Sequence, residues 1–141
     1  MPADQSLIHR QSALTHSQTT VPYLTPQEVD LMAAAAARTR HGERDELLIH
    51  LLFQTGLRVS ESLQITLAHI QTFEGRPVMR IVGKGSKPSL VACPKPLVES
   101  LQAYAFRHKL EIGDRVFPIN RKRAHQIITE AGKKPGLTKR V

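Results

Sequence analysis

The sequence predicts a mainly α-helical domain with a small antiparallel β-hairpin or sheet, and three observations favour this fold class. Apolar residues recur at helical spacing behind recognisable helix caps. Two short β-prone runs flank a glycine-containing turn. The chain of 141 residues is 40% hydrophobic, yet it holds only four Phe, two Tyr and no Trp. Its core must therefore consist mainly of Leu, Ile, Val and Ala, in one compact domain.

Ordered structure is expected to begin near Tyr23. Residues 1–22 are polar and rich in Ser, Thr and Gln, which indicates a flexible lead or linker before a domain spanning residues 23–141. Thr25-Pro26-Gln27-Glu28 is typical of a capping box with proline in the first helical turn. The helix it opens is predicted to run to about Arg38. Its buried stripe is Val29, Met32, Ala33 and Ala36.

Two helices are predicted on either side of Gly56. The run Arg44–Gln54 is apolar on most sides, as in a central helix surrounded by neighbours, and Gly56 can end it in a left-handed conformation. A shorter helix is expected over Arg58–Leu67. It would bury Val59, Leu63 and Leu67, and a loop containing Glu74, Gly75 and Pro77 would follow.

The second half of the chain predicts a hairpin and two helices. Val78–Val82 and Ser89–Ala92 are short β-prone runs joined by an extended turn that contains Gly83-Lys84-Gly85. A helix over Lys95–His108 would bury one apolar face: Leu97, Leu101 and Ala105. Another over Arg121–Gly132 would bury Ala124, Ile127, Ile128 and Ala131.

The positive charge is concentrated near the end of the chain. The net charge is +8, and residues 107–141 carry ten Lys or Arg against three Asp or Glu, whereas residues 1–106 carry ten against nine. A polyanion is the natural partner of such a segment, although a solvated basic surface is the simpler alternative. Charge alone does not separate DNA from RNA.

Composition also limits the chemistry and the compartment. The single cysteine, Cys93, excludes an internal disulfide framework and a cysteine-built zinc site. The histidines are scattered, without a pair at i and i+4 beside a carboxylate, so no metal site or other cofactor is expected. No stretch approaches the ~18 apolar residues of a membrane span, and no signal peptide is visible, which favours a cytoplasmic protein.

Arg58 and Lys84 are the candidates for chemistry. Arg58 follows the Gly56 break at the start of a short helix, where its planar guanidinium could grip a phosphate with two hydrogen bonds. The alternative is a surface ion pair with Glu61, three residues on. Lys84 lies between two glycines at the hairpin tip, where the chain can bend sharply towards a ligand. A Gly-Lys-Gly turn is by itself more often a solvated loop.

Taken together, these motifs give the chain a specific resemblance. It carries Thr25-Pro26-Gln27-Glu28, then the run from Leu51 to Glu61 (LLFQTGLRVSE), then Gly83-Lys84-Gly85-Ser86-Lys87. In this order they resemble the front part of the catalytic domain of tyrosine recombinases, the phage integrase family. The resemblance covers about residues 23–141. It implies that Arg58 is the first catalytic arginine at the scissile phosphate, that Lys84 protonates the leaving 5′ oxygen, and that Glu61 supports this region.

The resemblance also implies duplex DNA as the partner. Lys87 and the basic run Arg121, Lys122 and Arg123 are the further candidates for phosphate contacts. The sequence departs from the family pattern at Pro88-Ser89, where a polar and basic pair is usual, and at His69, where Asp is usual. The first departure affects the part of the hairpin expected to contact DNA.

The family's catalytic set continues with a His-x-x-Arg box and a nucleophilic tyrosine, which these residues lack. Tyr23 precedes the first helix and Tyr104 lies among packing residues, so neither is expected to attack DNA. We therefore expect a catalytically incomplete fragment. Absence of the helices that follow in the family is expected to uncover an apolar face at Ile127 and Ile128, through which the chain could self-associate.

Two other classes compete with this interpretation. Arg44–Gln54 and Arg58–Leu67 could form a helix-turn-helix around Thr55-Gly56 in a non-catalytic DNA-binding module. A basic RNA-associated structural protein would explain the charge but neither motif. The hairpin discriminates between a recombinase and a helix-turn-helix module, because a recombinase needs Lys84 and Arg58 near one phosphate and a helix-turn-helix module has no use for Lys84 beside Arg58.

Overall fold

The computed structural model describes residues 24–82 and 88–133. They form five α-helices, a 3-10 turn (η2, Leu67–His69) and three β-strands. The helices are α1 (Pro26–Ala36), α2 (Gly42–Thr55), α3 (Val59–Ser62), α4 (Lys95–Arg107) and α5 (Arg121–Lys133). The strands are β1 (Ile70–Phe73), β2 (Arg76–Val82) and β3 (Pro88–Ala92). The predicted fold class, mainly helical with a small antiparallel sheet, is confirmed.

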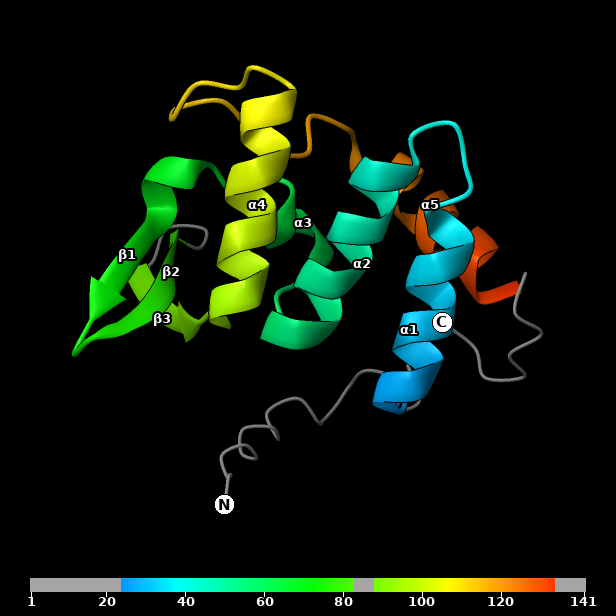
Figure 1. The fold of residues 1–141 in the computed structure, drawn as a ribbon, viewed down its shortest axis with the longest axis horizontal. Helices are drawn as coiled ribbons and strands as arrows, with labels where there is room; N and C mark the ends of the chain where they lie inside the picture. Colours follow the sequence, from blue (N-terminus) through cyan, green and yellow to red (C-terminus); the bar gives the residue numbers. More distant parts are fainter. Residues whose placement is uncertain (1–23, 83–87, 134–141) are drawn as a thin grey trace.

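The helices stand in a row beside the sheet. Figure 1 shows the sheet at one end, next to α4, with α2 and α1 following across the molecule and α5 behind them. Helix α2 packs against α1 on one side and α4 on the other, and α5 packs against α1. Leu48, Ile49 and Leu51 of α2 are fully buried. The prediction of a central helix surrounded by neighbours is therefore confirmed.

Local sequence signals fix the first two helices. Thr25 and Glu28 form the predicted capping box, with the Thr25 amide donating to Glu28 Oε1 at 2.8 Å and the Glu28 amide donating to Thr25 Oγ1 at 3.1 Å. The predicted stripe of α1 is buried as a set: Val29, Met32, Ala33 and Ala36. Gly56 ends α2 with φ of 76°, a left-handed conformation that favours glycine.

The sheet has one more strand than predicted. Its order is β1-β2-β3 with antiparallel pairing throughout, and Val82 pairs with Pro88 at the end of the predicted hairpin. The expected loop around Glu74 and Gly75 is instead a tight turn joining β1 to β2, with both residues at positive φ. Strand β1 shows no apolar alternation because most of its residues are exposed, so periodicity gave no signal for it.

The helix predicted over Arg58–Leu67 is wrong in length. Helix α3 ends at Ser62, Leu63 caps it, and Thr66 pairs with Arg115 in an isolated antiparallel bridge. A helix of four residues is about 6 Å long, too short to lie along a DNA groove as a recognition helix. The helix-turn-helix alternative therefore loses its second helix.

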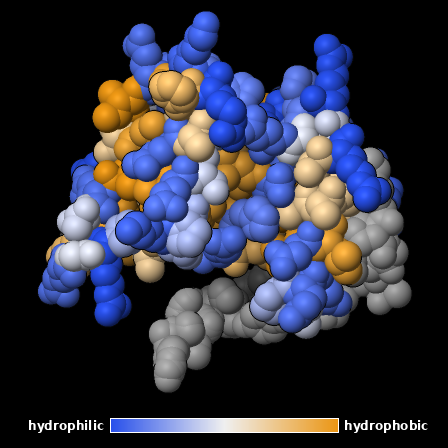
Figure 2. Space-filling view, in the orientation of Figure 1, coloured by the Kyte–Doolittle hydropathy of each residue, from blue (hydrophilic) through white to orange (hydrophobic). Residues whose placement is uncertain are grey.

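The prediction of an exposed apolar face at Ile127 and Ile128 is also wrong. These side chains are 5% and 8% exposed, because α5 turns them into the core. The largest exposed apolar side chains within the described ranges lie elsewhere, with Phe106 85% and Ile112 67% exposed. Figure 2 shows apolar surface interrupting the hydrophilic side chains around α4. None of the helices in the described ranges is long and apolar enough to cross a membrane.

Candidate nucleic-acid interface

Arg58 emerges directly from the end of α2. After Gly56 the chain buries Leu57, whose amide donates to Thr55 Oγ1 at 3.2 Å, and the next residue is exposed. Arg58 has an extended backbone (φ −70°, ψ 154°) and stands at the N-cap of α3. The buried leucine before it and the left-handed glycine together hold the Arg58 main chain at the surface.

Glu61 binds the main chain of Arg58 and leaves its guanidinium available. Its Oε1 accepts a hydrogen bond from the Arg58 backbone N–H at 2.9 Å. The buried Ser62 hydroxyl donates to the Arg58 carbonyl at 3.1 Å. Among the described residues, no ion pair joins the Arg58 guanidinium to Glu61 or to any other carboxylate. The surface ion pair considered as an alternative for Arg58 is therefore wrong.

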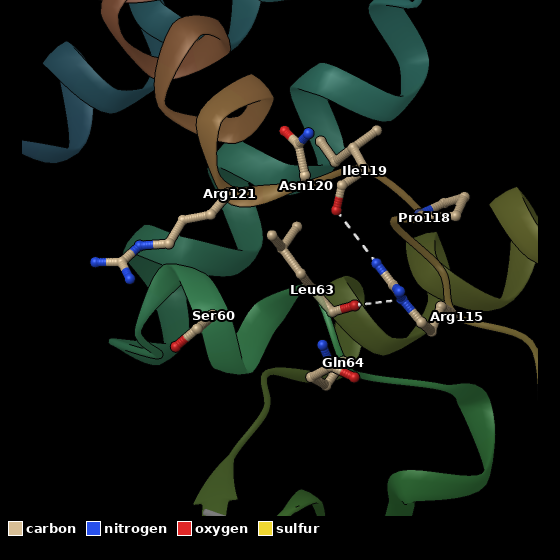
Figure 3. Close-up of a pocket in the computed structure, with 8 residues that line it drawn as sticks. All are labelled: Ser60, Leu63, Gln64, Arg115, Pro118, Ile119, Asn120 and Arg121. Carbon is tan, nitrogen blue, oxygen red and sulfur yellow. Dashed lines mark hydrogen bonds between the residues drawn. The ribbon is translucent and has the colours of Figure 1, made fainter. Parts of the chain in front are cut away.

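A hollow of about 440 Å³ is bordered by α3 and the start of α5, two helices that also contact each other. Figure 3 shows Ser60 of α3 and Arg121 of α5 on one side of it and Arg115 on the other. Its lining combines polar and apolar side chains: Ser60, Leu63, Gln64, Arg115, Pro118, Ile119, Asn120 and Arg121. The helix that begins just after Arg58 and the helix with the basic run thus border one concave surface.

The basic run forms the first turn of α5. Arg121, Lys122 and Arg123 are all exposed, and the Arg123 amide donates to Asn120 Oδ1 at 2.8 Å. Cations are disfavoured at a helix N-terminus, where the unpaired N–H groups already carry partial positive charge. This turn has no acidic residue to compensate. It is consequently a surface of high positive potential beside the hollow.

Arg115 borders the hollow on the side opposite Ser60 and Arg121, and it belongs to none of the motifs in the sequence. Its Nε donates to the Leu63 carbonyl at 2.9 Å, and its Nη2 donates to the carbonyls of Ile119 at 3.2 Å and Phe117 at 3.4 Å. An arginine in a connecting loop carries no local signal for such contacts. Only the approach of the chain around Leu63 creates the acceptor.

Lys84 and Lys87 lie outside the described residues, so the predicted approach of Lys84 to Arg58 stays a prediction. The strands on either side, β2 and β3, are paired as the hairpin prediction requires. Tyr104 is described and is 7% exposed. Burial raises the pKa of its hydroxyl, and its ring lies 4.2 Å from that of His108. Such a tyrosine is a packing residue, as predicted.

Comparison with solved structures defines the class. The chain superposes on the XerA recombinase with a TM-score of 0.66 and 25% identity, over 91% of this chain and 48% of that one. It superposes on XerH, a site-specific recombinase solved in a post-cleavage complex with its difH substrate, with a TM-score of 0.60 and 23% identity, over 89% of this chain and 39% of that one. The fold is that of a tyrosine recombinase catalytic domain.

Sequence comparison gives the family. The model of the phage integrase family matches residues 22–141, so the chain belongs to that family. It is 38% identical over 86 residues to the tyrosine recombinase XerD of Chlamydia pneumoniae, covering 57% of this chain and 27% of that protein. It is 35% identical over 91 residues to the tyrosine recombinase XerC of Mycobacterium bovis, covering 60% of this chain and 30% of that protein. The chain therefore spans about a third or less of the length of these relatives.

Proposed function

We propose that this chain is the part of a site-specific DNA recombinase that carries the first catalytic arginine and the hairpin lysine, and that it binds duplex DNA. The observation that supports this most directly is Arg58, held exposed at the start of α3 by Glu61 while its guanidinium forms no ion pair with the described residues. An arginine kept free in this way suits a phosphate ligand.

The proposed reaction is transfer of a DNA phosphoryl group to a tyrosine. The tyrosine oxygen bonds to phosphorus as the bond to the 5′ oxygen breaks, leaving a 3′-phosphotyrosine link and a free 5′ hydroxyl. Arg58 stabilises the charge that develops on the phosphoryl oxygens, and Lys84 gives its proton to the leaving 5′ oxygen. Glu61 positions Arg58. Tyr104 is buried and is not proposed as the nucleophile.

DNA binding is proposed to extend from Arg58 across the hollow to the basic turn of α5. Arg121, Lys122 and Arg123 would contact phosphates, and Lys87 would add a contact from the hairpin. XerH, whose fold this chain shares, has been solved bound to its DNA substrate. Binding through phosphates alone should be weak, largely independent of sequence and steeply salt-dependent.

The test is the slope of log K against log salt for a short duplex. Replacing Arg121, Lys122 and Arg123 by Gln should make the slope shallower by about 2.7, because each lost phosphate contact contributes about 0.9. A matched control replaces Arg38, Arg40 and Lys109 by Gln. These cations are exposed, make no ion pair with the described residues and do not line the hollow beside α3. Equal slopes for the two triple variants would contradict phosphate contacts by the basic turn of α5. Stronger binding to duplex RNA than to duplex DNA would favour an RNA-associated protein.

Self-association stays a prediction, but Ile127 and Ile128 do not form the exposed surface that was expected to support it. Ile127 and Ile128 are buried, whereas Phe106 and Ile112 expose most of their side chains. These two side chains are the candidates for such a contact. Sedimentation of the chain and of Phe106→Ser across a range of concentrations tests this. A monomer at every concentration would contradict self-association.

A further inference from the structure

Arg115 joins two parts of the molecule that lie far apart in sequence. Its Nε–H binds the carbonyl of Leu63, the residue that caps α3. Its Nη2 donates to the carbonyls of Phe117 and Ile119, which lie in the segment that leads into α5. Figure 3 shows the guanidinium directed at the Leu63 and Ile119 carbonyls. One side chain therefore bridges the end of the Arg58 helix and the beginning of the basic helix.

Helix α3 depends on such support. A helix of four residues is unstable alone, and its last carbonyls have no partners within the helix. Arg115 provides a charged donor for one of these carbonyls. Main-chain contacts join the same two segments: the Val116 amide donates to the Ile65 carbonyl at 3.1 Å, and Thr66 pairs with Arg115.

The donors of Arg115 are largely used within the protein. A guanidinium has five N–H donors, one on Nε and two on each Nη. The single Nε donor and both Nη2 donors match the three carbonyls of Leu63, Phe117 and Ile119. A lysine cannot reproduce this arrangement, because its donors diverge from a single nitrogen. The geometry is that of a structural bridge rather than of a free cation.

We propose that Arg115 is a positioning residue for DNA binding. It holds Arg58 and the basic turn at residues 121–123 at a fixed separation, so that both reach phosphates of one duplex together. This inference rests on the proposed function. Its physical basis is preorganisation: two contacts fixed in the right geometry bind together without a further loss of conformational freedom, whereas two contacts on mobile elements must first be ordered.

The first experiment separates positioning from charge. Arg115→Lys keeps the positive charge and loses the bridge, and Arg115→Met loses both. Both variants should lose duplex affinity by about three- to tenfold, and Arg115→Lys should leave the salt slope unchanged. Arg40→Lys, at an exposed arginine that forms no ion pair with the described residues, is the matched control and should bind as the natural chain does. If Arg115→Met unfolds, Arg115→Gln, which retains two amide donors, replaces it.

Two outcomes would overturn the proposal. If Arg115→Lys binds normally while Arg115→Met flattens the slope by about 0.9, Arg115 contacts a phosphate itself. If neither variant changes the affinity, the bridge does not serve DNA binding.

The second experiment needs no DNA. Spin labels at Ser60→Cys in α3 and Thr129→Cys in α5, both exposed positions, report the separation of the two helices, and the natural Cys93 is buried. The distance distribution should be narrow in the natural background and broader with Arg115→Lys. An unchanged distribution would overturn the positioning role. If the natural chain bound no duplex at any salt concentration, the proposed function would fail, while the distance measurement would still decide whether Arg115 positions the helices.

Discussion

The carboxylate of Glu61 accepts a hydrogen bond from the backbone N–H of Arg58 at 2.9 Å, and this contact closes the first turn of α3. A glutamate at the third helical position commonly satisfies the N-cap amide in this way. The Glu61 carboxylate therefore binds the main chain of Arg58, the candidate catalytic arginine, and leaves the Arg58 side chain free for a ligand.

Removing that acceptor should loosen the start of α3. We expect Glu61→Ala to lower the free energy of unfolding by about 1 kcal/mol, whereas Glu61→Gln, which keeps an acceptor oxygen, should cost about half as much. Urea titration measures both. Glu99→Ala, at an exposed glutamate of α4, is the control and should change little. Equal stability of Glu61→Ala and Glu99→Ala would show that the contact is dispensable.

Arg58 should contribute to DNA binding through geometry as well as charge. Arg58→Lys should weaken duplex binding without changing the salt slope, because a point charge replaces a planar fork. Arg58→Ala should also make the slope shallower by about 0.9. Fluorescence anisotropy at several salt concentrations distinguishes the two effects. Arg38→Ala, at another exposed arginine, serves as the comparison, and identical slopes for the two alanine variants would argue against a phosphate contact at Arg58.

Two isoleucines test the packing of α5. Ile128 is 8% exposed and Ile112 is 67% exposed, so the same substitution should have different consequences. Ile128→Ala should lower the free energy of unfolding by about 2–5 kcal/mol through lost burial and the cavity left behind. Ile112→Ala should cost less than about 0.5 kcal/mol. Chemical denaturation compares them, and similar values would mean that α5 does not pack as described.

Glu43 should make stability depend on pH. Hydrogen bonds from Arg107 and His108 lower the pKa of its carboxyl from the ordinary value of 4.5, and they tie the start of α2 to the end of α4. Since the folded pKa is depressed, the stabilisation is present above pH 4.5 and disappears as the pH falls through the lower folded value. The group is exposed to solvent, so the effect should stay below about 1 kcal/mol.

The measurement for Glu43 is the difference in unfolding free energy between the natural chain and Glu43→Gln. That difference should shrink as the solution is acidified below pH 4.5. A difference that persists at low pH would mean that packing, rather than ionisation, accounts for the role of Glu43.

A polypeptide of these 141 residues should not form a covalent adduct with DNA. Arginine and lysine can stabilise charge and supply a proton, but the phosphotyrosine bond needs a positioned nucleophile, and residues that act as a unit lose nearly all activity when one is missing. Incubation with nicked suicide duplexes, followed by a denaturing gel, is the assay. An adduct that disappears in Tyr104→Phe or Tyr23→Phe would contradict this expectation.

The features of the fold that depend on residues close together in the chain could be predicted from the sequence. The capping box at Thr25 and Glu28 and the left-handed end of α2 at Gly56 are satisfied by residues within four positions. The buried face of α5 followed from helical spacing, because a helix presents residues three and four apart to the same side. The family motif around Arg58 is likewise a continuous run.

The length of α3, the presence of β1 and the contacts of Arg115 depend on segments that are far apart in the chain and could not be predicted from local sequence. Strand β1 exists because β2 offers it hydrogen-bonding partners. Helix α3 ends at Ser62, and Thr66, which was expected to continue it, pairs with Arg115 instead. The Arg115 guanidinium meets the Leu63 carbonyl from 52 positions along the chain. Main-chain carbonyls are the same in every residue type, so their use by a distant side chain leaves no trace in local sequence and is fixed only when the core brings the two segments together.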